Sequence, residues 1–266
     1  MKKICIFAIG LLVIHLCCAQ DKAFKTKVTK DQNIATTVTI RKSTKQKEGA
    51  YFKVDRNTGD TLVIGQYVND KRAGVWRFAD KKAMYFAYDF TENRMAQTSP
   101  LIQAVDTFIV KADNGEYILS RVDTPSLFLG YKNELEALLS KSIRLPLSVM
   151  EKHVTGTAVV SFVIDEHGLM KDVKSEVVLD KELNKELIRR VTEVDGEWLP
   201  AVKEGKPVEA KWMVGVSLSE GRDTSAFHSF APKPYLIPLT LCYFSVTRTE
   251  TRKIQSTSPQ YNGRIR

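Results

Sequence analysis

Short runs in which apolar and polar positions alternate dominate the first half of the chain. A period of two is typical of half-buried β-strands, and turn-forming residues separate the runs. The clearest turn is Asp113-Asn114-Gly115, because Asn and Gly tolerate the positive φ of tight hairpins. The pattern predicts an antiparallel β region, with a loose polar arm over much of 20–47 and strands at 36–41, 49–52, 62–68, 74–78, 84–90, 105–110 and 117–122.

A helical period appears only after residue 123. Three leucines between 135 and 139 form an apolar stripe that predicts a helix over 132–142, with Asn133 as N-cap and Glu136 as its capping-box partner. A second stripe predicts a helix over 181–194, for which Asp180 is the natural N-cap.

Three strands accompany these helices. One is predicted over 157–164, a hairpin loop at Asp165-Glu166-His167-Gly168 leads to a return strand, and a final strand covers 208–218. The final strand alternates most regularly, so a slip of one residue would expose its whole apolar set. Glu209, Lys211 and Ser217 are expected to point outward, and the inward set is Val208, Ala210, Trp212, Val214, Val216 and Leu218.

These motifs resemble the C-terminal domain of the TonB energy-transducer family over residues 128–218. That family has a glycine opening a strand of the type Val-Val-x-Phe-x-Ile-Asp-x-x-Gly, then a helix, Trp-x-Pro, and Gly-Lys-Pro-Val before the last strand. Here Gly156 opens the strand and Gly168 closes its motif, followed by Trp198-Leu199-Pro200 and Gly205-Lys206-Pro207-Val208. Leu145-Pro146 replaces the family's Tyr-Pro, and a Pro-rich spacer is missing, so the resemblance implies the fold more than energy transduction.

The resemblance implies an α+β fold class. An N-terminal antiparallel β region would precede a TonB C-terminal-like domain made of a helix, a β-hairpin, a helix and a final antiparallel strand. The predicted divisions are a leader at 1–19, the β region at 20–122, the TonB-like domain at 123–220, and an extension at 221–266 with one strand and a basic tail. Structural roles are implied for Gly156, Gly168, Trp198, Pro200, Gly205 and Pro207.

In the TonB family the last strand can pair with a short peptide of an outer-membrane β-barrel receptor. An edge strand offers unpaired N–H and C=O groups that an extended peptide completes. The resemblance therefore implies a partner-binding edge formed by Val208, Glu209, Ala210, Lys211, Trp212, Met213 and Val214. Two alternatives stay open, namely that the strand at 239–246 covers this edge or that a second copy does so in a homodimer.

One segment of the β region, residues 65–78, is similar to a MORN-type repeat. It has Gly65-Gln66-Tyr67, a turn containing Asn69 and Lys71, and Gly74-Val75-Trp76, although Asp70 stands where the repeat usually has glycine. One clear copy cannot build a stacked array, since each unit buries its face against a neighbour. We therefore interpret it as a hairpin within a sheet, with Tyr67, Trp76 and Phe78 as packing residues.

The chain begins with Met1-Lys2-Lys3 and an apolar run over 4–18, the pattern of a secretory signal peptide. Cleavage is predicted after Ala19, which implies a periplasmic or cell-envelope protein. Lipidation at Cys17 or Cys18 is disfavoured because neither follows a small residue in a lipobox. The run is also shorter than the roughly 20 residues that span a bilayer. Cys242 alone would remain after cleavage, which excludes an internal disulfide.

The formal net charge is +9. Export argues against nucleic acid as a partner, but a basic surface is compatible with peptidoglycan or another anionic polymer. A structural envelope protein that holds such a polymer is thus the alternative to a binding protein with a protein partner.

Candidate chemistry is sparse. His153, His167 and His228 show no metal-ligand spacing, and neither a phosphate-binding glycine loop nor a nucleophile–base pair is recognisable. We predict no catalytic residue, no metal site and no cofactor, and hence a protein that is not an enzyme.

Overall fold

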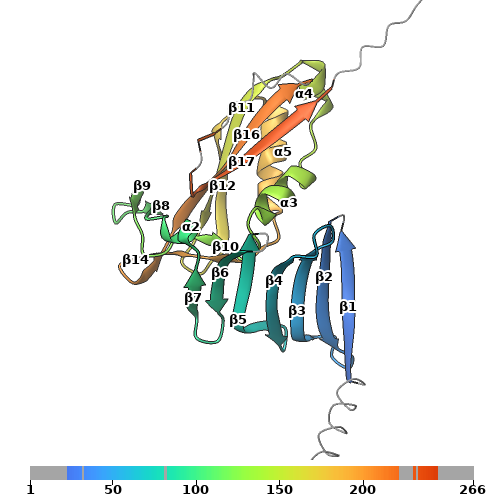
Figure 1. Cartoon of the computed structure of the whole chain (residues 1–266). Helices are drawn as coiled ribbons and strands as arrows, with labels where there is room; N and C mark the ends of the chain where they lie inside the picture. Colours follow the sequence, from blue (N-terminus) through green and yellow to red (C-terminus); the bar gives the residue numbers. More distant parts are fainter. Residues whose placement is uncertain (1–22, 32, 81–82, 222–229, 232, 245–266) are drawn as a thin grey trace, which may run out of the picture.

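A computed structural model describes residues 23–31, 33–80, 83–221, 230–231 and 233–244. Two β-sheets dominate it, and short helices lie beside the second sheet (Figure 1). The predicted leader, its cleavage site and the basic tail lie outside the described residues, and so do His228 and Cys17.

The first sheet is a meander of seven antiparallel strands in chain order. Each strand pairs with the next through a short turn, so neighbours in sequence are neighbours in space (Figure 1). The strands are β1 (Phe24–Asp31), β2 (Ile34–Arg41), β3 (Lys47–Asp55), β4 (Thr61–Val68), β5 (Lys71–Asp80), β6 (Ala83–Asp89) and β7 (Arg94–Thr98). The predicted loose arm is wrong for β1, whose register with β2 is unbroken from end to end.

One face of the meander, which we call its inner face, carries the aromatic core. Tyr67, Trp76 and Phe78 are buried there, which confirms their predicted packing role. The MORN-like segment is the β4–β5 hairpin. Trp76 contacts the rings of Tyr51 and Tyr67 at centroid distances of 5.1 and 5.0 Å, and its indole N–H donates to the Gln66 carbonyl at 3.1 Å.

Gly65 is the position that lets the Trp76 ring lie flat on the sheet. A Cβ atom at Gly65 would come within 2.2 Å of Trp76 Cδ2, closer than any real contact. We expect Gly65→Ala to lower the free energy of unfolding by about 1–3 kcal/mol, the usual cost of overpacking. Urea unfolding followed by tryptophan fluorescence checks this, with Gln66→Ala as the exposed control; an unchanged midpoint for Gly65→Ala would contradict the packing account.

The second sheet has six strands in the order β12-β11-β16-β8-β9, with β17 pairing parallel to β16. Small β10–β13 and β14–β15 pairs lie beside it. Its strands are β8 (Thr107–Lys111), β9 (Tyr117–Arg121), β11 (Gly156–Ile164), β12 (Met170–Val177), β16 (Ala210–Glu220) and β17 (Leu236–Tyr243), and the short strands are β10 (Leu127–Phe128), β13 (Trp198–Leu199), β14 (Ala201–Lys203) and β15 (Lys206–Val208).

The helices are α2 (Pro100–Gln103), α3 (Glu134–Ser142), α4 (Leu147–Glu151) and α5 (Lys181–Thr192). Asp180 caps α5 as predicted, accepting the backbone N–H groups of Glu182 and Leu183. The predicted capping box of α3 is wrong. Asn133 makes no side-chain cap bond, and Glu134 instead accepts from the Tyr131 N–H.

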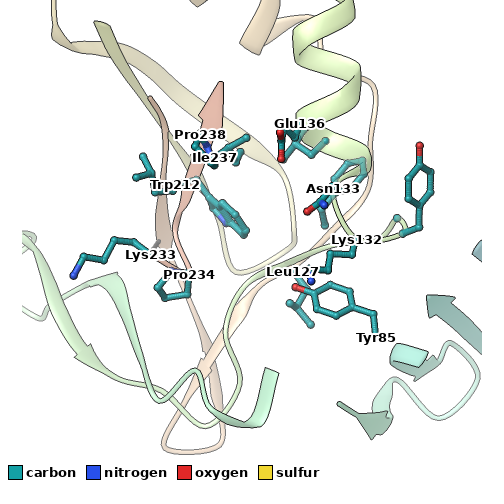
Figure 2. A pocket seen from close by; sticks show the side chains of 15 residues that line it. Tyr85, Leu127, Lys132, Asn133, Glu136, Trp212, Lys233, Pro234, Ile237 and Pro238 are labelled. Atoms are coloured by element: carbon teal, nitrogen blue, oxygen red, sulfur yellow. The ribbon is translucent and has the colours of Figure 1, made fainter. Parts of the chain in front are cut away.

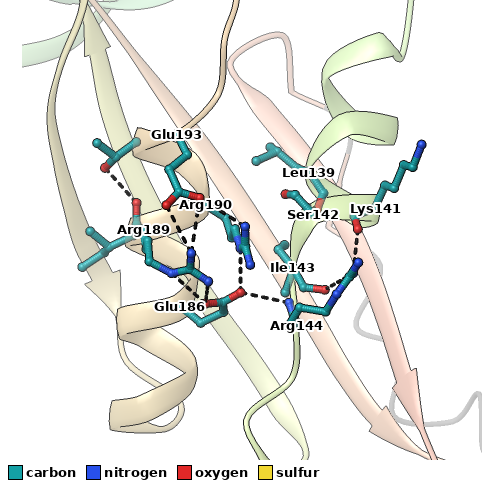
Figure 3. Close-up of polar contacts among 11 residues, drawn as sticks. Leu139, Lys141, Ser142, Ile143, Arg144, Glu186, Arg189, Arg190 and Glu193 are labelled. Atoms are coloured by element: carbon teal, nitrogen blue, oxygen red, sulfur yellow. Dashed lines mark hydrogen bonds and ion pairs between the residues drawn. The ribbon is translucent and has the colours of Figure 1, made fainter. Parts of the chain in front are cut away.

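Glu186 ties α5 to the segment that follows α3 (Figure 3). Its carboxylate accepts from the Arg144 backbone N–H at 3.0 Å and from Arg190 Nε at 2.7 Å, and it also pairs with Arg189. Burial alone would raise the pKa of Glu186, but these hydrogen bonds outweigh burial and hold it below its ordinary value. Leu183, Leu187 and Val191 of α5 meanwhile pack into the core of the second sheet.

The predicted α+β class is wrong. Strands make up 53% of the structure and helices 15%, and the layout is two large antiparallel sheets rather than a TonB-like domain. The second sheet gains strands from distant parts of the chain: β8 pairs with β16 and carries β9, and β17 pairs with β16 after a long connection. The predicted boundary at residue 122 therefore divides the second sheet, whereas the change of sheet falls between β7 and β8.

The two sheets contact one another through apolar and charged side chains that both contribute. Leu127, Leu129 and Leu199 belong to the same apolar cluster as Trp76 and Phe86 of the meander. Ion pairs reinforce this contact, joining Lys53 to Glu134, Arg72 to Glu197 and Lys141 to Asp31.

Candidate functional site

The predicted binding edge, residues 208–214, is not an edge. Residues 210–214 pair with β11 on one side of β16. On the other side Ala210 faces Val110 of β8, while Met213 and Val214 pair with β17. The Met213 N–H donates to Tyr235 O at 2.7 Å. Of the two open alternatives, the structure favours the one in which a strand near 239–246 covers this side.

The side chains of the predicted edge are also occupied. Trp212 and Val214 lie in the core, and Val208 belongs to β15, paired with Ala201. Glu209 and Ser217, both expected to point outward, are buried. The family-motif residues have structural positions: Gly168 (φ 79°) lies so close to β13 that a Cβ would approach Trp198 O to 2.4 Å. Trp198 is buried, Gly156 begins β11, and Pro200 lies between β13 and β14. Gly205 lies in the β14–β15 turn, and Pro207 lies in β15, where it pairs with Val202.

Glu209 occupies a buried ionic cluster. It accepts from the Tyr117 hydroxyl at 2.6 Å, from Lys111 Nζ at 3.2 Å and from Lys171 Nζ. Burial would raise the pKa of Glu209, but the hydrogen bonds from Lys171, Tyr117 and Lys111 lower it to about 2. This cluster joins β9, β8 and β12 to the start of β16, so it stabilises the sheet.

A small pocket opens between α3, β10 and the start of β17 (Figure 2). Its volume is about 240 Å³, below the range of roughly 300–1,000 Å³ in which pockets hold drug-sized ligands. The indole of Trp212 faces it, but the indole N–H already donates to Ser126 Oγ at 3.1 Å. Nothing in its lining assigns a ligand.

The outward edge of β17 contains a proline, which disfavours the addition of another strand. The bonds Met213 N–H to Tyr235 O and Gly221 N–H to Tyr243 O show that odd-numbered residues of β17 direct their backbone groups to β16. Pro238 therefore faces outward, where it costs no ladder bond and removes a donor from the free edge. Cys242 lies near this edge and is exposed.

Three further edges offer little to an added strand. The β12 edge is charged and irregular, because its pairing with β11 contains register shifts and Asp172 has a positive φ of 52°. The β7 and β9 edges have five residues each. Charged, bulged or short edges resist strand addition.

The β1 edge is different. It is eight residues long and, among the residues that the structure describes, pairs only with β2, so it forms the outer end of the described meander (Figure 1). The Lys42 N–H donates to Ala23 O at 2.9 Å, which sets the phase of the ladder. In this phase the backbone groups of alternate residues bond to β2, namely those of Lys25, Lys27, Thr29 and Asp31. The N–H and C=O groups of the residues between them point outward, namely those of Phe24, Thr26, Val28 and Lys30.

Val28 lies in the middle of this edge and is 52% exposed. We expected a binding edge in 208–214 and missed this one. The signal was present in residues 25–28, where lysine alternates with β-branched residues.

Among the described residues, no group of three or more His, Cys, Asp and Glu side chains is arranged to hold a metal ion. Within the same residues, no helix has the length and apolar character needed to cross a membrane. No family model, curated protein or solved structure matches the chain.

Proposed function

We propose that this chain is an exported cell-envelope protein that binds a protein partner by strand addition at the free edge of β1. The observation that carries the proposal is the eight-residue unbroken register of β1 with an outward row of backbone groups. An extended peptide satisfies such groups with main-chain hydrogen bonds and reads side chains on both faces. Export rests on the leader pattern at 1–19.

The mode of binding is the one that the TonB resemblance implies, but its place is different. The strand that corresponds to the family's binding strand is enclosed by β11, β8 and β17. The β1 edge has neither a proline nor a register shift, so it supports strand addition better than the other edges described above.

Proline at Val28 tests the proposal. Val28 directs its N–H away from β2, so Val28→Pro removes an outward donor and places a ring on the edge while the β1–β2 ladder stays intact. With a photo-crosslinking residue at Thr26 and the protein in its native envelope, we expect crosslinks to fall at least tenfold, since each lost hydrogen bond is worth about 1 kcal/mol and the ring blocks close approach.

Leu119→Pro is the matched control. The Ala112 N–H donates to the Glu116 carbonyl, so even-numbered residues of β9 direct their backbone groups to β8. Leu119 therefore directs its backbone groups outward, and its side chain is exposed. Crosslinking that survives Val28→Pro in a folded protein would refute strand addition at β1.

Salt dependence distinguishes strand addition from the alternative function, in which the protein holds an anionic polymer. Lys25, Lys27 and Lys30 give β1 a basic character, which an anionic polymer such as peptidoglycan would use. Binding to purified peptidoglycan that vanishes at high salt and in a Lys25→Gln, Lys27→Gln, Lys30→Gln variant, but not in Val28→Pro, would favour that alternative over strand addition.

A further inference from the structure

We infer that the partner at the β1 edge is a second copy of this chain, paired antiparallel about a two-fold axis through Val28. The two meanders would then form one continuous fourteen-stranded sheet. This inference rests on the proposed function, because it names the partner of the same edge. The hydrogen-bond phase, the charge complementarity and the exposure of β1 support this partner.

The phase restricts the registers that two copies can adopt. Outward groups belong to residues 24, 26, 28 and 30, so an antiparallel pair must place these residues opposite one another. The two-fold axis can then pass only through a residue of β1, and three axes near the middle give useful overlap: those through Lys27, Val28 and Thr29.

Charge and the length of the overlap together select among the three axes. An axis through Lys27 sets Lys27 directly against the partner's Lys27, and like charges in that position destabilise a strand pair. An axis through Thr29 also sets a lysine, Lys27, opposite the partner's Asp31, but it keeps only residues 27–31 of β1 opposite β1 of the partner. An axis through Val28 pairs residues 25–31 and sets Lys25 opposite the partner's Asp31, twice by symmetry.

The side-chain faces agree with this register. Lys25 and Asp31 pair with Ile40 and Ile34 of β2 and share the inner face. Asp31 already binds Lys141 Nζ at 2.6 Å, but both side chains are largely exposed, so Asp31 remains accessible to a second lysine. On the outer face Val28 would cover the partner's Val28, which removes the exposed apolar side chain in the middle of the edge.

The symmetry also closes the assembly. Both copies use the same edge, so the contact is isologous and ends with two chains rather than a fibre. The outer ends of the joined sheet would then be the two short β7 edges, each of five residues.

Cysteine pairing tests the register directly. Lys27 and the partner's Thr29 would form a non-hydrogen-bonded pair, in which Cα atoms lie about 4.5 Å apart, within disulfide range. With all four native cysteines replaced by serine, we expect a disulfide when Lys27→Cys protein is mixed with Thr29→Cys protein under mild oxidation. An efficient disulfide between two copies of Lys27→Cys would show that the two-fold axis passes through Lys27. An efficient disulfide between two copies of Thr29→Cys would show an axis through Thr29. Either result would overturn the proposed register.

Light scattering after gel filtration tests the dimer. We expect the unsubstituted protein and Leu119→Pro to have twice the monomer mass at micromolar concentration, and Val28→Pro to have the monomer mass. A dimer that survives Val28→Pro would overturn the inference. A monomer at every concentration, with Thr26 crosslinks to a different protein that Val28→Pro abolishes, would overturn the inference but leave the proposed function standing. If Val28→Pro kept both the dimer mass and the Thr26 crosslinks, the inference and the proposed function would both be overturned.

Discussion

Replacement of Trp76 by alanine is expected to lower the free energy of unfolding by about 4–5 kcal/mol, the upper end for large-to-small substitutions. The ring is fully buried and lies among four other aromatic rings. Its loss would also remove the surface beneath the Arg72 guanidinium, whose carbon lies 4.4 Å from the ring centroid. Arg72 Nε lies 3.3 Å from Glu197, yet neither Nε nor Nη1 of the guanidinium has a partner in hydrogen-bond geometry. The indole therefore supports a buried cation as well as an apolar core.

Urea unfolding followed by far-ultraviolet circular dichroism measures this effect. Val75→Ala is the matched control, because Val75 is the preceding residue, points to the other face and is 45% exposed. We expect Val75→Ala to change stability by less than about 0.5 kcal/mol. Equal losses for the two variants would show that the inner face is not the core of the meander.

The second large effect is expected for Glu209→Gln, at about 1.5–3 kcal/mol at pH 7, because it removes the charge from a buried carboxylate that accepts hydrogen bonds from Tyr117, Lys111 and Lys171. The folded-state pKa of about 2 lies below the ordinary 4.5. The carboxylate thus stabilises the fold fully above about pH 4.5, and this contribution is lost as the pH falls towards 2. In Glu209→Gln this part of the acid sensitivity should be missing.

Urea unfolding at pH 7, 5, 4 and 3 checks both the size and the sign. Glu92→Gln serves as control, since Glu92 is exposed in the β6–β7 turn. If Glu209→Gln lost stability between pH 5 and 3 as steeply as the unsubstituted protein, the low pKa of Glu209 would be ruled out.

Local features were predictable because neighbouring residues determine them. The β4–β5 hairpin with its Gly65, Tyr67 and Trp76, and the Asp180 cap of α5, all depend on residues close in sequence. The apolar alternation of β16 likewise identified Trp212 and Val214 as core residues.

The neighbours of a strand were not predictable in the same way. Alternation shows which face is buried but not which strand lies alongside, so β8 and β9 were placed in the wrong sheet. One signal was overlooked: residues 212–219 contain no charged side chain, which is typical of an enclosed strand. Gly215 fits this position, because Phe230 covers it so closely that a Cβ would lie 2.5 Å from the ring.

The two sheets also differ in the order in which they can form. Every pairing of the meander joins consecutive strands, so it can assemble from local contacts. The second sheet joins Ala210 to Val110 and then adds β17, the last described strand, in parallel. Until β17 arrives, β16 presents an apolar, uncharged edge to other unfinished chains. The interval between completion of the meander and docking of β17 is therefore when a newly made chain is most prone to aggregate.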